Sequence, residues 1–247
     1  MERNLFAKNE LLRAVEPTLR PQLAKRLSVI ELARGDALFR PGEAVARVYF
    51  PLRGLVGLLA ETRDGQGVNS VMIGREGAIG VFEACGSRQF FAEAEVQVEG
   101  QAAVLSAAAY RELFNDSASI RTAIHRYVEQ LMSETRQSVI CNSMHGAQAR
   151  LSRVILEALD RSGTGDTLPL TQETLARMVG TRRTTIAEIL SRLQRETIIS
   201  TRRGALNVER RADLEARACS CREGLRSVCA AIWQSSEPAC ESTLTAA

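Results

Sequence analysis

Residues 170–208 have the sequence LTQETLARMVG TRRTTIAEILSRLQRETIIS TRRGALNV, which predicts two short helices separated by a tight turn. Thr171 can cap the first helix, because its hydroxyl can accept a hydrogen bond from a free backbone N–H. Gly180 allows the positive φ that a tight turn between helices requires. The second helix is expected over residues 182–195, where apolar residues recur at helical spacing. These residues are Ile186, Ile189, Leu190 and Leu193.

A basic hairpin is expected after the second helix. Residues 198–201 and 205–208 favour short strands, and the turn 202–204 between them holds two arginines and a glycine. Two helices followed by such a hairpin form a winged helix-turn-helix. Arg182 and Arg183 fall at the first turn of the second helix, where a recognition helix presents side chains to the major groove of DNA.

The charge distribution supports DNA binding. Residues 171–211 hold nine arginines and four glutamates, a net charge of +5, whereas residues 212–247 carry −2 and the whole chain +3. Residues 1–170 are therefore neutral overall. Two helices around a glycine also occur in proteins that never bind DNA. Here, however, the positive charge is concentrated on the one segment whose geometry needs it for phosphate contacts, which predicts binding to double-stranded DNA.

Nine residues are candidates for DNA contact. The first-turn arginines can donate in pairs to guanine or can contact phosphate alone, and the sequence leaves both roles open. The two arginines of the wing turn are expected to contact phosphate. The candidates are Thr171, Arg182, Arg183, Thr184, Thr185, Glu188, Arg192, Arg202 and Arg203.

The N-terminal half has a different pattern. Residues 5–16 favour one short amphipathic helix, and Pro17 is expected either to end it or to begin a second short turn of helix. Between residues 27 and 106, short apolar stretches alternate with turn signals at a spacing of roughly 8 to 12 residues, which indicates an all-β sandwich or barrel.

A long helix is expected over residues 117–144, with Asp116 or Ser117 as its cap. Its apolar stripe is too broad for one contact surface, so one edge is expected on the β domain and the other on the same helix of a second copy. A helix that is merely buried is the alternative. A further amphipathic helix follows over residues 147–161.

The expected domains are an N-terminal helix (1–19), a β-roll (20–115), a dimerisation helix (116–144), a winged helix-turn-helix (145–211) and a tail (212–247).

Composition argues against several classes of function. Aromatic residues make up 4% of the chain, which disfavours stacking platforms for single-stranded nucleic acid. The N-terminus lacks the order of a signal peptide and no apolar run approaches membrane-spanning length, so a cytoplasmic protein without membrane contact is expected. With two histidines, no phosphate loop and no nucleophile motif, the sequence predicts no enzyme.

The cysteines raise the question of a metal site. Cys141 and His145 are four residues apart, a spacing at which two side chains can share a metal, but a structural role at the junction between domains is favoured. Cys219 and Cys221 would converge only if the helix around them is broken. For these two, and for Cys229 and Cys240, helix packing is the default and metal or redox sensing the alternative. No metal and no cofactor is predicted.

Taken in order, the β-roll, the long helix and the winged helix resemble the cyclic-AMP receptor and fumarate-nitrate regulator (Crp/Fnr) family. The strongest segments are residues 74–80, 171–180 and 185–193. The resemblance implies an α+β fold with an N-terminal jelly roll like that of cyclic-nucleotide-binding domains, a long dimerisation helix and a C-terminal winged helix-turn-helix. It implies a homodimeric transcription regulator of inverted-repeat operators, with double-stranded DNA, a second copy and RNA polymerase as partners.

The departures from the family concern the input signal. Cyclic-nucleotide binders of this family have Gly-Glu for the ribose and an arginine about ten residues later for the phosphate. The corresponding residues here are Gly80-Val81 and Phe90 or Phe91. The first cysteine is Cys85, so the N-terminal cysteine cluster of the oxygen-sensing members is missing. The effector is therefore left unknown, and the alternative function is a redox or small-molecule sensor that acts through protein contacts.

Overall fold

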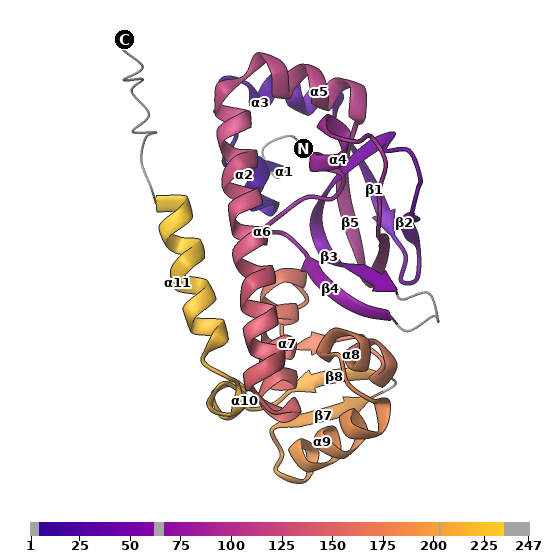
Figure 1. Cartoon of the computed structure of the whole chain (residues 1–247), viewed down its shortest axis with the longest axis vertical. Helices are drawn as coiled ribbons and strands as arrows, with labels where there is room; N and C mark the ends of the chain where they lie inside the picture. The colour runs from indigo at the N-terminus through magenta and orange to yellow at the C-terminus, as the bar shows by residue number, and fades with distance from the viewer. Residues whose placement is uncertain (1–4, 62–66, 203, 235–247) are drawn as a thin grey trace, which may run out of the picture.

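The computed structural model describes residues 5–61, 67–202 and 204–234, and it places two domains at the ends of a long helix (Figure 1). The N-terminal domain contains an antiparallel sheet in the order β1-β5-β3-β4, with β2 also paired to β5. The fold is α+β, as the sequence predicts. The strands are β1 (Ser28–Leu32), β2 (Ala37–Phe39), β3 (Arg47–Glu61), β4 (Gly67–Ile73) and β5 (Glu93–Ser106).

Two long strands give this sheet its curvature. β3 has 15 residues, β5 has 14, and their register shifts at three places between Pro51 and Val56. Such bulges bend a strand and increase its twist, so the sheet rolls around its own core. An isolated bridge between Tyr49 and Ile79 brings the segment after β4 back onto β3.

The N-terminus corrects one prediction. Instead of one helix over residues 5–16, the chain forms α1 (Leu5–Lys8) and α2 (Glu10–Arg13), followed by α3 (Arg20–Arg26). Asn9 interrupts the helix, because its fully buried side chain accepts from the Leu12 N–H and donates to the carbonyl oxygens of Pro51 and Gly77. These tertiary hydrogen bonds leave Asn9 in an extended conformation that caps α2.

The long helix is confirmed. α4 (Val81–Cys85) and α5 (Ala107–Asp116) precede α6 (Ala118–Met144), whose 27 residues extend roughly 40 Å. Ser117 is the cap, since its hydroxyl accepts from the Ile120 N–H at 3.3 Å. One face of α6 is buried against the rolled sheet, and Ile120, Ile124 and Tyr127 belong to that core.

The C-terminal domain begins with α7 (Ala147–Ser162). Its other elements are β6 (Thr167–Leu168), α8 (Gln172–Val179), α9 (Arg183–Arg195), β7 (Ile199–Arg202) and β8 (Ala205–Val208). β6 was not expected from the sequence; it pairs with β8 and makes the wing a three-stranded sheet. None of the helices in the described residues combines the length and the apolar character that crossing a bilayer requires.

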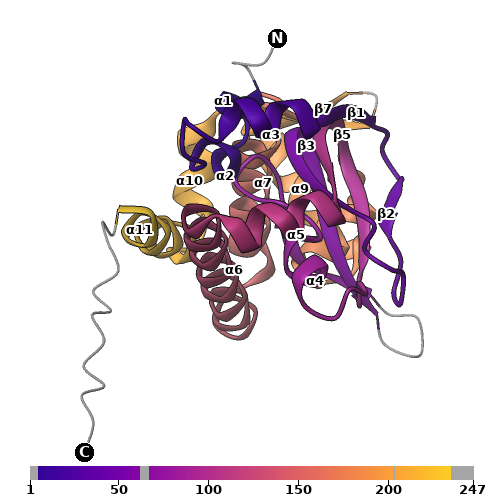
Figure 2. The same ribbon diagram turned by 90° about the horizontal axis from the view of Figure 1, so that it is seen from above.

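Two further helices, α10 (Arg211–Arg217) and α11 (Cys221–Gln234), follow the wing. α11 runs beside α6 on the side away from the rolled sheet, as both views show (Figures 1 and 2). The indole N–H of Trp233 donates to Gln130 Oε1 of α6 at 2.8 Å. The tail therefore packs on the long helix.

The C-terminal domain packs directly on the rolled sheet. Leu55 and Val98 of the sheet share a buried core with residues of α7, α8 and α9. Gly74, just after β4, lies so close to α7 that a Cβ there would be 2.5 Å from the carbonyl oxygen of Arg161. The Arg75 N–H donates to the same carbonyl at 3.1 Å. A glycine at position 74 is therefore what allows the two domains to approach this closely.

Arg161 joins three parts of the chain through a buried ion cluster. Its guanidinium lies 2.9 Å from a carboxylate oxygen of Glu134 on α6 and 3.4 Å from one of Glu76 in the loop after β4. It also donates to the carbonyl oxygen of Met72 at 2.6 Å. The two carboxylates share one cation, and burial raises the pKa of Glu76 to about 7.

We expect Arg161→Met to lower the free energy of unfolding by about 3–5 kcal/mol, because two carboxylates would stay buried without a cation. Chemical denaturation at pH 8, where Glu76 is mostly ionised, measures the effect. The matched control is Arg26→Met, since Arg26 pairs with Glu112 through side chains about half exposed to solvent. The control should cost less than about 1 kcal/mol, and equal losses from both variants would contradict the importance of the cluster.

Candidate DNA-binding interface

The first helix of the motif begins at the predicted cap. Thr171 Oγ1 accepts a hydrogen bond from the Thr174 N–H at 3.0 Å, and the residue stays exposed. Gly180 ends α8 in the left-handed region at φ 64°. Between these ends, Leu175 and Met178 point into the core of the domain. The turn chemistry expected from the sequence is therefore confirmed at both ends of α8.

The second helix presents its first turn to solvent. Arg182 is its N-cap, and Arg182, Arg183 and Thr184 are all exposed. The opposite face of α9 holds the predicted apolar stripe in the core. Its buried residues are Ile186, Ile189, Leu190 and Leu193. This packing fixes the helix with its basic start facing outward.

The wing is fixed to the recognition helix. Gln194 of α9 donates to Thr201 Oγ1 of β7 at 2.5 Å. Arg202 is exposed at the end of β7, next to the turn; Arg203 lies outside the described residues. Hydrogen bonds from Ser200 and Asn207 hold the pKa of Glu209 below its usual range, so an ionised carboxylate stands at the base of the wing.

The starts of both helices and the wing border one groove. Thr171 from the start of α8, Arg183 from the start of α9 and Thr201 from β7 all line it. The fold thus brings together residues that are up to 30 positions apart in the sequence. A backbone phosphate beside the recognition helix would meet this combination of hydroxyl and guanidinium donors.

The arginines of the basic segment differ in their partners. Arg177 lies 3.5 Å from Glu95 of the sheet, and the two arginines that begin α10 also pair with acids. Within the part of the chain that the structure describes, no ion pair involves Arg182 or Arg183. The start of α9 therefore carries two neighbouring arginines without an acidic partner among the described residues.

Three other candidates lie further along α9. Thr185 is half-buried and Glu188 is exposed. Arg192 donates to Gln148 Oε1 of α7 at 3.0 Å, so its guanidinium helps to hold α9 against α7 rather than facing the groove. Contact of any of the nine candidates with DNA stays a prediction.

Both domains match known families. Residues 149–217 match the Crp-like helix-turn-helix domain, and residues 29–117 match the cyclic nucleotide-binding domain. The chain belongs to the Crp/Fnr family of transcription regulators. The helix-turn-helix described above is thus the DNA-binding domain of a Crp/Fnr regulator.

A sequence relative and two solved structures are similar to this chain. The chain is 23% identical over 193 residues to a CRP-like cAMP-activated global transcriptional regulator of Mycobacterium tuberculosis, covering 76% of this chain and 86% of that protein. The structure of FixK2 from Bradyrhizobium japonicum is similar with a TM-score of 0.67 at 12% identity, covering 78% of this chain and 98% of that one. A transcriptional regulator of the CRP family from Thermus thermophilus gives a TM-score of 0.65 at 20% identity, covering 76% and 96%.

In this Crp/Fnr chain, apolar side chains occupy the positions expected to face a cyclic nucleotide. Val81 is 1% exposed, and Phe90 is 2% exposed with its ring stacked on Phe39 at a centroid distance of 4.6 Å. Phe91 is 69% exposed, so of the two phenylalanines it is Phe90 that lies inside the roll. Arg88 is exposed to solvent.

We expect no saturable heat when cyclic AMP or cyclic GMP is titrated at millimolar concentration in a calorimeter. A cyclic phosphate buried beside Phe90 without a cationic partner would lose its hydration without compensation, at a cost of several kcal/mol. A micromolar dissociation constant for either nucleotide would contradict this, and Arg88→Ala would then test whether a loop shift supplies the cation.

Proposed function

We propose that this chain acts as a homodimer that binds an inverted-repeat operator and regulates transcription from it. The observation that carries the proposal is the start of α9, where Arg182 and Arg183 are exposed and have no acidic partner among the described residues. Arginine side chains at the first turn of a recognition helix can donate in pairs to guanine in the major groove. Arg202 of the wing would then contact the phosphate backbone.

A second copy is the partner that fits α6. This helix has an exposed apolar face, formed by Met132, Val139, Ile140 and Met144, whose exposed fractions lie between 50% and 75%. With 3.6 residues per turn, this face lies roughly opposite the buried one that carries Tyr127. A 27-residue helix with a second apolar face fits a pairing with the same helix of another chain.

Two-fold symmetry determines the form of the operator. Each chain supplies one recognition helix, so a dimer reads two half-sites related by the same two-fold axis. Their centres would be about one helical turn apart, roughly 34 Å, which makes the operator an inverted repeat. Contact with RNA polymerase stays a prediction.

The alternative is a sensor that acts through protein contacts alone. A mobility shift with the DNA upstream of the gene separates the two functions. A regulator binds this DNA with an affinity that falls steeply as salt increases, because phosphate contacts release counterions. A chain that binds no duplex even at low salt would favour the alternative.

We expect Arg183→Ala to weaken binding to an operator selected from a random duplex library by about 1–3 kcal/mol, and binding to unselected DNA by less. Arg202→Ala should weaken both about equally and lower the salt slope by about 1, and the same is predicted for Arg203→Ala. Fluorescence anisotropy over a salt series measures both quantities. The control Arg26→Ala removes the same charge far from the interface. If Arg183→Ala instead lowers the affinity for selected and unselected DNA equally, Arg183 contacts only phosphate.

We expect Ile140→Asp to raise the dimer dissociation constant by at least roughly 100-fold, because each dimer would bury two unpaired carboxylates. Sedimentation velocity at micromolar concentration compares the variant with the wild-type chain. Val29→Asp introduces the same charge at a similarly exposed valine of β1 and should leave the dimer intact. A wild-type chain that stays monomeric even on its operator would remove the basis of the dimer proposal.

A further inference from the structure

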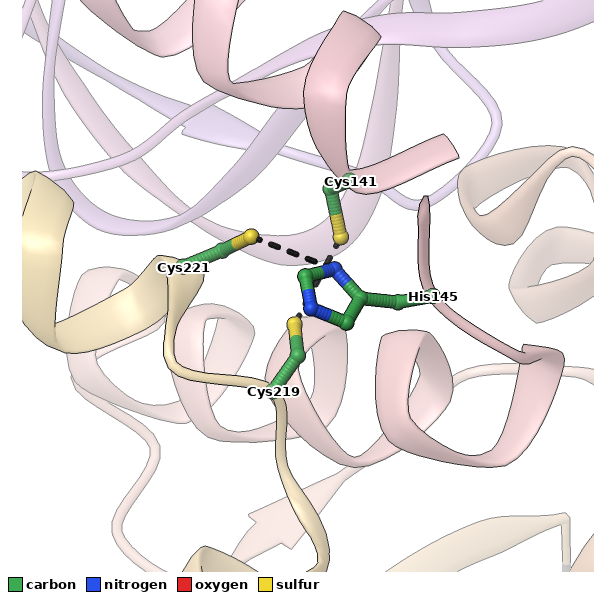
Figure 3. A group of neighbouring side chains, drawn as sticks. All are labelled: Cys141, His145, Cys219 and Cys221. Atoms are coloured by element: carbon green, nitrogen blue, oxygen red, sulfur yellow. Dashed lines mark hydrogen bonds between the residues drawn. The ribbon is translucent and has the colours of Figure 1, made fainter. Parts of the chain in front are cut away.

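Four potential metal ligands converge at the C-terminal end of α6. They are Cys141, His145, Cys219 and Cys221, and their ligand atoms all lie within 4.8 Å of one another (Figure 3). The Sγ atoms of Cys141 and Cys219 are 3.5 Å apart, and Sγ of Cys221 is 3.5 Å from Nδ1 of His145. The four side chains point toward a common centre from two segments that are more than 70 residues apart in the sequence.

The backbone explains why these side chains meet. Cys141 lies in the last turn of α6 and His145 is its C-cap, so residues four apart share one face of the helix end. On the other side, α10 ends at Arg217 and α11 begins at Cys221, which leaves Cys219 outside both helices. The helix break on which convergence of the two tail cysteines depends is therefore present.

The three cysteines of the cluster are shielded from solvent. Cys141 is 0% exposed, Cys219 7% and Cys221 4%, and His145 is half-buried. The three cysteines form a small core of their own, separate from the cores of the two domains. The Cys219 N–H also donates to the carbonyl oxygen of Ala149 at 3.4 Å, which attaches the tail to the start of α7.

We propose that these four residues bind one Zn²⁺ ion as a tetrahedral Cys₃His site. Zinc–sulfur bonds of about 2.3 Å and zinc–nitrogen bonds of about 2.0 Å place neighbouring ligands of a tetrahedron roughly 3.5–3.8 Å apart. The two separations of 3.5 Å match that spacing. Four protein ligands without an open position are typical of a structural zinc site, not a catalytic one.

Ligand chemistry favours a single soft or borderline ion. Thiolate and imidazole together select zinc over magnesium or calcium, which prefer oxygen ligands. An iron–sulfur cluster divides its protein ligands among two or four irons, so it needs some ligand atoms further apart than the 4.8 Å found here. A Cys141–Cys219 disulfide would leave Cys221 and His145 without a role.

A neighbouring guanidinium can stabilise part of the charge of such a site. Three thiolates and one Zn²⁺ carry a net charge of −1, which is costly to bury alone. Arg153 of α7 is 8% exposed and interacts electrostatically with Cys141 and Cys219. It pairs with Glu157 at 2.7 Å, while its Nε–H is buried without a hydrogen-bond partner in the described residues and is available to a ligand sulfur.

The position of the site indicates what the ion stabilises. The ligands come from the end of α6, from the hinge at His145 that leads into the C-terminal domain, and from the start of α11. Zinc would hold α11 against α6 at one end, while Trp233 holds it at the other. It would also fix the angle at which the DNA-binding domain leaves the long helix.

The test is the metal content of the full-length chain. Purified without a metal-affinity step, the wild-type protein should contain one zinc per chain by plasma mass spectrometry. Reconstitution with Co²⁺ should give the visible absorption of a tetrahedral site and a thiolate charge-transfer band in the near ultraviolet. Cys221→Ser should weaken zinc binding on the order of 100-fold or more, because one charged sulfur ligand is lost.

Matched controls keep the test decisive. Cys85→Ser and Cys229→Ser remove cysteines outside the cluster and should retain the zinc and the cobalt spectrum. A competing chelator should lower the melting temperature of the wild-type chain and leave that of Cys221→Ser unchanged. The proposal is overturned by a wild-type chain that binds neither zinc nor cobalt, by a Cys141–Cys219 disulfide in metal-free protein, or by bound iron with acid-labile sulfide.

Discussion

The arrangement of this molecule depends on a single buried arginine. Arg161 lies at the end of α7, yet its guanidinium reaches Glu134 on the long helix and Glu76 beside the rolled sheet. Because both carboxylates are buried, neither can lose the cation without a large desolvation cost. Gly74 has no Cβ, which allows the backbone after β4 to lie directly against the end of α7. These contacts determine how the DNA-binding domain sits relative to the helix that would carry the two-fold axis.

The two domains differ in what they bury and what they expose to solvent. In the rolled sheet, stacked rings of Phe39 and Phe90 fill the interior where relatives of the family could hold a ligand. The winged helix instead buries its apolar stripe completely and exposes a basic first turn. The chain shares the DNA-binding scaffold of its family, whereas the interior of its rolled sheet offers no cationic partner to a cyclic phosphate at Val81 or Phe90. The ligand cluster at His145 lies where the long helix α6 ends and the C-terminal domain begins.

Local signals predicted the elements well, and tertiary contacts account for the differences. Ser117 and Thr171 cap helices through their own hydroxyls, and Gly180 ends a helix through its own backbone, so each is visible in the sequence. The break at Asn9 depends on carbonyl groups 42 and 68 residues away, which no local pattern reveals. The contact of Cys219 with Cys141, 78 residues apart in the sequence, likewise depends on where the fold places the tail. The sequence alone showed only that both residues could bind a metal.

Folding of this chain is linked to proton uptake at the domain junction. The ordinary pKa of the Glu76 carboxyl is 4.5, whereas burial holds it at about 7 in the folded protein. The native state therefore binds more protons between these values than the unfolded chain. The stabilising contribution is complete below pH 4.5 and is lost as the pH rises through about 7. Since Glu76 lies where the sheet, α6 and α7 meet, this pH-dependent part of the folding stability is located at the junction between the two domains.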